Sequence, residues 1–138
     1  MTNSPAQDPP GRPSQVTLAA GLLSASLGIG VVVSALTWTQ LTATASIGFA
    51  LTVQVATIGL LFWLIYELWS GRNWARLTVA VLWGVGLPFY FSTLMRYFTI
   101  SRAAGYLSLL QTALHLAAFY LIFFRPGSSW FKARAVVP

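Results

Sequence analysis

Four long apolar runs set the main limit on what this chain can fold into. Each is close to the roughly 20 residues that an α-helix needs to cross a bilayer. The sequence is 57% hydrophobic and only 7% charged, whereas about 25% of the residues in a soluble domain are charged. Too little polar surface remains to cover a globule in water. The sequence therefore predicts an all-α, polytopic membrane protein with four antiparallel transmembrane helices and a disordered N-terminal tail.

The chain divides into three segments by composition. Residues 1–15 are rich in proline and small polar residues, so they predict the disordered tail. Residues 16–125 form the transmembrane domain, with helices expected over 16–37, 47–69, 75–95 and 105–124 and a threonine-rich loop over 38–46. Residues 126–138 form a tail in which aromatic side chains stand beside basic ones, which suits the headgroup layer of an anionic leaflet.

The segment from Tyr66 to Arg76 joins the second and third runs and predicts a tight helical hairpin. Gly71 suits the left-handed conformation that ends a helix, and Asn73 is expected to cap the next one. An acid in the last turn of a helix opposes the helix dipole, so we expect Glu67 to pair with Arg72 or Arg76. A docking or gating site for a partner is the alternative for these three residues.

The basic residues predict the orientation. If both termini are cytoplasmic, six bases lie inside, namely Arg12, Arg72, Arg76, Arg125, Lys132 and Arg134, against Arg96 and Arg102 outside. The positive-inside rule favours this arrangement over its inverse. It also explains the net charge of +6 without nucleic acid, because the bases lie singly at the ends of apolar runs. We therefore expect a cell inner-membrane protein with the lipid bilayer as its main partner and no nucleic acid.

Polar residues within the apolar runs are the candidate functional residues. Ser108, Gln111, Thr112 and His115 share one face of the last helix because they are three or four residues apart. Gln54 lies at a similar depth in the second helix. Polar groups inside a membrane face the bundle interior and mark functional sites, so we define these five residues as the polar seam. Interhelical hydrogen bonding, a proton or substrate path, and ligand binding without transport all remain open.

Small residues form two rows along the first helix at a spacing of four. One row is Ala20, Ser24 and Gly28, and the other is Ser26, Gly30 and Ser34. Such rows let helix backbones approach closely. We expect one of them to pack within the bundle, with contact to a second copy or to another membrane protein as the alternative.

Residue inventory limits the chemistry. The chain has no cysteine and one histidine, so thiolate metal sites, thiol redox chemistry and bis-histidine haem are excluded. No nucleophile–base pair is apparent. We expect no cofactor, no metal and no enzymatic activity. The leading function is that of a non-enzymatic membrane protein acting through helix or subunit contacts. The alternative is a small transporter or channel-like protein with a path through Gln54 and His115.

The turn Gly71-Arg72-Asn73-Trp74-Ala75-Arg76 and the later Gly86-Leu87-Pro88 resemble the uncharacterised small four-helix proteins of bacterial inner membranes. Those proteins often show a G-R-x-W-A-R cytoplasmic turn before a leucine-rich helix. The resemblance extends in layout over residues 47–125. It implies a fold and a location, and no activity.

Overall fold

The computed structural model of the protein describes residues 13–124 and Phe131. These residues form helices and no strand, in the order α1 (Ser14–Leu36), α2 (Trp38–Thr44), α3 (Ile47–Trp69), α4 (Asn73–Ile100) and α5 (Arg102–Phe123). All but the short α2 are long and apolar enough to cross a membrane. The prediction of an all-α protein with four membrane-length helices is confirmed. Apart from Pro13, Ser14, Gln15 and Phe131, the predicted tails lie outside the described residues.

Local sequence signals account for most helix ends. Gly71 has φ 85° and is the left-handed residue that ends α3. Ser46 caps α3 through a hydrogen bond from the backbone N–H of Phe49, and Ser101 caps α5 through one from Ala104. The expected cap by Asn73 is wrong. Asn73 is the first residue of α4, and the side chain of Arg72 at the cap position makes no capping bond.

Two predicted loops are shorter than expected. The segment at 38–46 contains α2, and α4 continues past Arg96 to Ile100, so that Ser101 alone separates α4 from α5. Arg96 does not end the helix because a long basic side chain can extend toward the interface while its backbone stays helical. Gly105 permits the sharp return, since a Cβ on it would lie 2.5 Å from the ring of Phe98.

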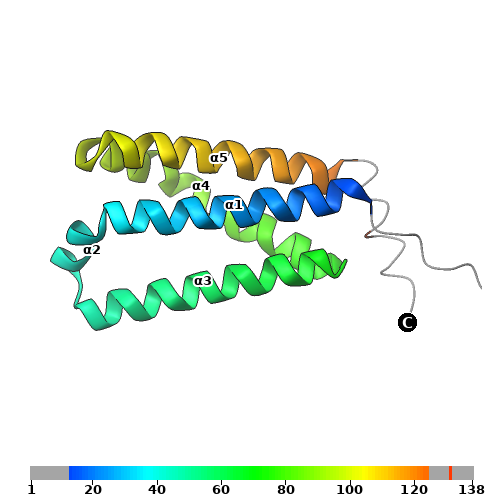
Figure 1. Cartoon of the computed structure of the whole chain (residues 1–138), viewed down its shortest axis with the longest axis horizontal. Coiled ribbons are helices and arrows are strands. Elements are labelled where there is room, and N and C mark those ends of the chain that lie inside the picture. Colours follow the sequence, from blue (N-terminus) through cyan, green and yellow to red (C-terminus); the bar gives the residue numbers. More distant parts are fainter. Residues whose placement is uncertain (1–12, 125–130, 132–138) are drawn as a thin grey trace, which may run out of the picture.

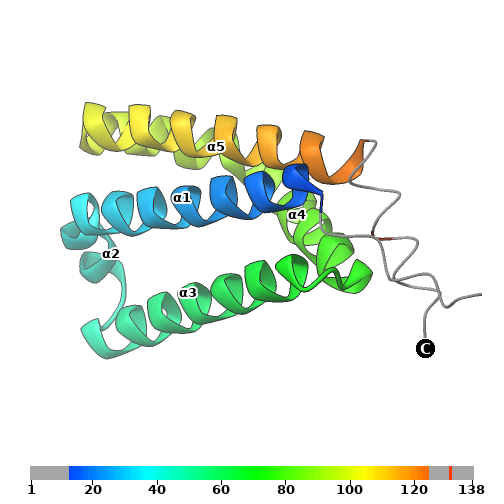
Figure 2. The ribbon, with the colours of Figure 1, turned by 45° about the vertical axis from the view of Figure 1, so that its right-hand side comes forward.

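The helices pack unevenly. Figure 1 shows α1 between α5 and α3, with α4 running obliquely behind them from the Gly71 turn beside α3 to the Ser101 turn beside α5. The contact between α1 and α5 is the most extensive in the bundle, followed by that between α4 and α5. Figure 2 shows α1 and α3 diverging toward the end that carries α2. The bundle is therefore narrow at one end and open at the other.

Apolar side chains fill the narrow end, where the Gly71 turn, the start of α1 and the end of α5 meet. We call it the closed end, and its buried cluster consists of Val16, Ala19, Leu23, Leu68, Ala75, Ala118, Ile122 and Phe131. Phe131 is fully buried there, beyond the end of α5. The opposite end, which carries α2 and the Ser101 turn, is called the α2 end.

Candidate functional site

His115 is held between two helices near the middle of the bundle. Its Nδ1 atom lies 2.9 Å from the backbone oxygen of Gln111, and its Nε2 atom lies 3.2 Å from Ser26 Oγ on α1. A carbonyl oxygen can only accept, so Nδ1 carries the proton and donates. In the neutral ring Nε2 can then only accept. The single proton of the Ser26 hydroxyl is shared between Nε2 and the backbone oxygen of Leu23, which lies 3.1 Å from Ser26 Oγ. Both ring nitrogens are therefore engaged, one by the backbone of Gln111 and the other by Ser26.

One turn further along the same contact, Gln111 packs against Gly30. A Cβ on Gly30 would lie 3.0 Å from Gln111 Nε2, so the missing side chain makes room for the amide. Ser26 and Gly30 on α1 thus face His115 and Gln111 on α5, as expected for antiparallel helices with both pairs four residues apart. We call these four residues the α1–α5 ladder. It uses the row of Ser26, Gly30 and Ser34.

The other row has a different environment. Ala20 is buried, but Ser24 and Gly28 are exposed, and nothing lies within 4 Å of a Cβ added to Gly28. The Ser24 hydroxyl donates to the backbone oxygen of Ala20, four residues back. The tight packing expected along one of the two rows therefore falls on the row with Gly30, and Gly28 has no part in it.

Gln54 is brought near Gln111 and not near Ser26. The two amides line one cavity of about 210 Å³ together with Gly30, Ser34 and Thr57. We call it the α1–α3 cavity, and it occupies the space where α1 and α3 diverge. Among the described residues, no hydrogen bond joins Gln54 to His115. The matching depth of Gln54 and His115 therefore does not bring them into contact.

Two further cavities adjoin this one. The α4–α5 cavity, of about 330 Å³, is lined by the remaining seam residues Ser108, Thr112 and His115, and also by Gln111. The α2–α4 cavity, of about 190 Å³, lies at the α2 end and is lined by Gln40, Thr44 and Arg96 among others. Tyr97 lines all three cavities. The polar seam therefore lines a divided hollow that extends from the middle of the bundle toward the α2 end.

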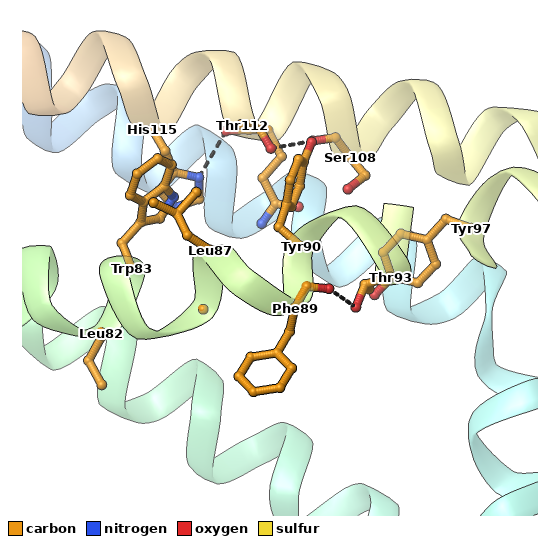
Figure 3. A pocket seen from close by; sticks show the side chains of 12 residues that line it. Leu82, Trp83, Leu87, Phe89, Tyr90, Thr93, Tyr97, Ser108, Thr112 and His115 are labelled. Carbon is orange, nitrogen blue, oxygen red and sulfur yellow. Dashed lines mark hydrogen bonds between the residues drawn. The ribbon is translucent and has the colours of Figure 1, made fainter. Parts of the chain in front are cut away.

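Figure 3 shows the α4–α5 cavity from close by. Tyr90 extends from α4 toward α5 and ends beside Thr112 and Ser108, whereas Phe89 points away from α5. The hydroxyl oxygen of Tyr90 is buried and has no hydrogen-bond partner. The hydroxyl of Thr112 donates to the backbone oxygen of Ser108 in its own helix. Tyr90 therefore presents an unused hydroxyl to this cavity.

At the Gly71 turn, Glu67 pairs with Arg72, whereas Arg76 lies apart from them. Arg72 Nε lies 2.9 Å from Glu67 Oε2. This contact is electrostatic and not a directed hydrogen bond, because Oε2 is buried without a hydrogen-bond partner. The Glu67 side chain is 10% exposed and that of Arg72 61% exposed. Water around Arg72 therefore screens the pair, and such pairs contribute about 0–1 kcal/mol.

Arg76 is buried apart from that pair. Its guanidinium carbon lies 4.9 Å from the centre of the Phe123 ring and 5.5 Å from that of Phe131. Nε and Nη1 are buried and have no hydrogen-bond partner among the described residues. Arg76 is thus a cation held by aromatic faces at the closed end.

Sequence reasoning missed Ser26 as the partner of His115, and Tyr90 and Tyr97 as lining residues. The sequence pattern identifies Ser26 only as a member of a row of small residues on the first helix. The spacing of seven between Tyr90 and Tyr97 places them on one face of a helix, and this signal could have identified them.

Comparison of the chain with known protein families, characterised proteins and solved structures finds no match. The resemblance of the Gly71 turn to small bacterial inner-membrane proteins therefore stays a prediction. The site is interpreted from its own geometry.

The first prediction concerns the α1–α5 ladder. Gly30→Ile should destabilise the protein by about 1–3 kcal/mol, because branching at Cβ adds two carbons beside the amide of Gln111. Gly28→Ile makes the same change two residues away, where a Cβ meets nothing, and should be nearly neutral. Unfolding of both variants in mild detergent checks this. Equal destabilisation by the two changes would contradict the assigned face.

The second prediction concerns the bond between Ser26 and His115. A double-mutant cycle with Ser26→Ala and His115→Leu should give a coupling energy near 0.6 kcal/mol, the average for hydrogen bonds between membrane helices. The cycle with Ser24→Ala and His115→Leu is the control and should give none, since the Ser24 hydroxyl bonds to Ala20 and Ser26 is the serine of α1 that reaches His115. Coupling in the control cycle alone would show that α1 is rotated relative to this structure.

Proposed function

We propose that this protein is a non-enzymatic, multi-pass membrane protein that binds a small neutral molecule in the hollow around Tyr97. The observation that supports this best is the contrast between the two ends. Three cavities that include hydroxyl and amide groups in their linings extend from the middle of the bundle toward the α2 end. The closed end holds a buried apolar cluster, and a further cavity of about 420 Å³ between α4 and α5 beside it is lined by apolar and aromatic side chains. Concave sites with a few polar groups among apolar ones are where small molecules bind.

The lining groups support binding over catalysis. The polar groups among them are mainly hydroxyls and amides, with Arg96 in the α2–α4 cavity, and hydroxyls and amides orient a ligand through hydrogen bonds. His115 has the only imidazole in the chain, and both its nitrogens are already engaged by Ser26 and Gln111. It therefore offers no free base to the hollow.

A transport role is the second candidate and adds one requirement, that the closed end opens. Arg76 supports it, because this buried cation contacts two aromatic rings at the closed end and its Nε and Nη1 have no hydrogen-bond partner in the described part of the chain. The contact role has a weaker basis. Ser24 and Gly28 remain exposed on α1 after α5 has covered Ser26, so a second copy or another membrane protein can still reach them.

The third prediction tests whether the hollow is wet. The chain has no cysteine, so single cysteines can be placed directly. Thr93, which lines both the α4–α5 and the α2–α4 cavity, and Gln54 should react with a hydrophilic, membrane-impermeant maleimide as Thr93→Cys and Gln54→Cys. Water in the hollow permits this reaction, and mass spectrometry of protein in liposomes measures it.

Matched controls lie beside both positions. Phe91 is 70% exposed on α4 and Val55 is 67% exposed on α3, and neither lines the three cavities. Phe91→Cys and Val55→Cys should stay unlabelled because lipid surrounds them at nearly the same depths. If Thr93→Cys and Gln54→Cys are equally inert, the hollow is dry and the contact role becomes the better account.

The fourth prediction concerns orientation in the cell inner membrane. Placing both chain ends and the Gly71 turn in the cytoplasm puts six of the eight bases there. In a bacterial host, reporter fusions after Arg76 and after Lys132 should report the cytoplasm, and a fusion after Ser101 should report the periplasm. A periplasmic signal after Arg76 would reverse the orientation and place the hollow on the cytoplasmic side.

A further inference from the structure

The α4–α5 cavity differs from its two neighbours in its aromatic lining. Trp83, Phe89, Tyr90 and Tyr97 all come from α4, and the seam residues of α5 stand opposite. Its volume of about 330 Å³ lies at the lower end of the range of about 300–1,000 Å³ that small-molecule sites occupy. Aromatic rings favour offset or edge-to-face contact with another ring. The cavity therefore suits a ligand with one flat ring.

Two hydroxyls of this cavity can donate to the same acceptor. The hydroxyls of Thr93 and Thr112 donate to backbone oxygens of their own helices, and both nitrogens of His115 are engaged. Tyr90 Oη is buried without a partner, so its proton is available. Ser108, 6% exposed, lines the same wall beside it (Figure 3). A carbonyl oxygen between these two hydroxyls would accept from both.

Charge and access limit the ligand further. No Asp, Glu, Lys or Arg side chain lines this cavity, and both nitrogens of His115 are engaged, so an ion would lose its hydration without compensation. Its rim includes Leu82, Leu87 and Phe89, which are 45%, 40% and 68% exposed on a membrane-spanning helix. Those side chains face hydrocarbon, and a ligand that enters between them arrives from the lipid.

We propose that the α4–α5 cavity binds the ring of a lipid-soluble quinone. This class is neutral, has one planar ring with carbonyl acceptors at its edges, and carries an apolar tail that the rim can accommodate. Tyr90 and Ser108 donate to one carbonyl, and the rings of Trp83 and Tyr97 flank the quinone. The inference is for binding alone, with no electron transfer, and it rests on the proposed function.

The test uses the full chain in lipid nanodiscs with decylubiquinone as the probe. Titration calorimetry should show saturable binding with about one site per chain. Tyr90→Phe removes one donor with little change in shape and should weaken binding about tenfold. Tyr106→Phe is the control and should leave the affinity unchanged, because Tyr106 is 65% exposed on α5 and does not line the cavity.

Two further ligands separate the possible failures. Decylbenzene keeps a ring and tail without carbonyls and should bind at least tenfold more weakly than the quinone. Equal binding of 1-decanoylglycerol, which has carbonyl and hydroxyl groups but no ring, would overturn the quinone assignment and leave a neutral-lipid site. Absence of decylubiquinone binding while Thr93→Cys is labelled by the hydrophilic maleimide overturns this inference alone. Absence of both results also removes the proposed function.

Discussion

The structure depends on the close approach of α1 and α5. In a membrane, lipid tails are as apolar as leucine, so helices gain little from covering apolar side chains and must associate through packing and hydrogen bonds. The α1–α5 ladder supplies both. Ser26 engages the ring of His115, and Gly30 leaves room for the amide of Gln111. No other pair of helices in the described chain has so extensive a contact.

This concentration of packing leaves the rest of the bundle open. Because α5 takes the small-residue face of α1, α3 meets α1 less extensively, and the two helices diverge toward the α2 end (Figure 2). The polar seam therefore lines cavities instead of a solid core. At the closed end, Phe131 and the ends of α1, α3, α4 and α5 bury one another. The cavities of the polar seam and the buried cluster at the closed end are thus both explained by one uneven contact.

The sequence predicts the number, length and order of the membrane helices, because each depends on local composition and on signals such as Gly71. It also places residues by depth, since a helix rises about 1.5 Å per residue. It does not give the rotation of a helix about its axis. Gln54 and His115 match in depth, yet His115 meets Ser26 of α1, because the tight row on α1 draws α5 to that side. The sequence also predicts that the third helix ends at residue 95, whereas the backbone stays helical through Arg96 to Ile100.

The central claim is that one face of α4 borders a wet hollow while its other faces meet lipid. Spin labels placed singly along residues 86–97 of α4 measure this most directly, through their accessibility to oxygen and to a water-soluble nickel chelate. Accessibility to the chelate should peak at Tyr90, Thr93 and Tyr97, with a helical period, and oxygen accessibility should peak at the intervening positions, such as Phe91. Oxygen accessibility alone around the whole helix, with no peak for the chelate, would contradict the account.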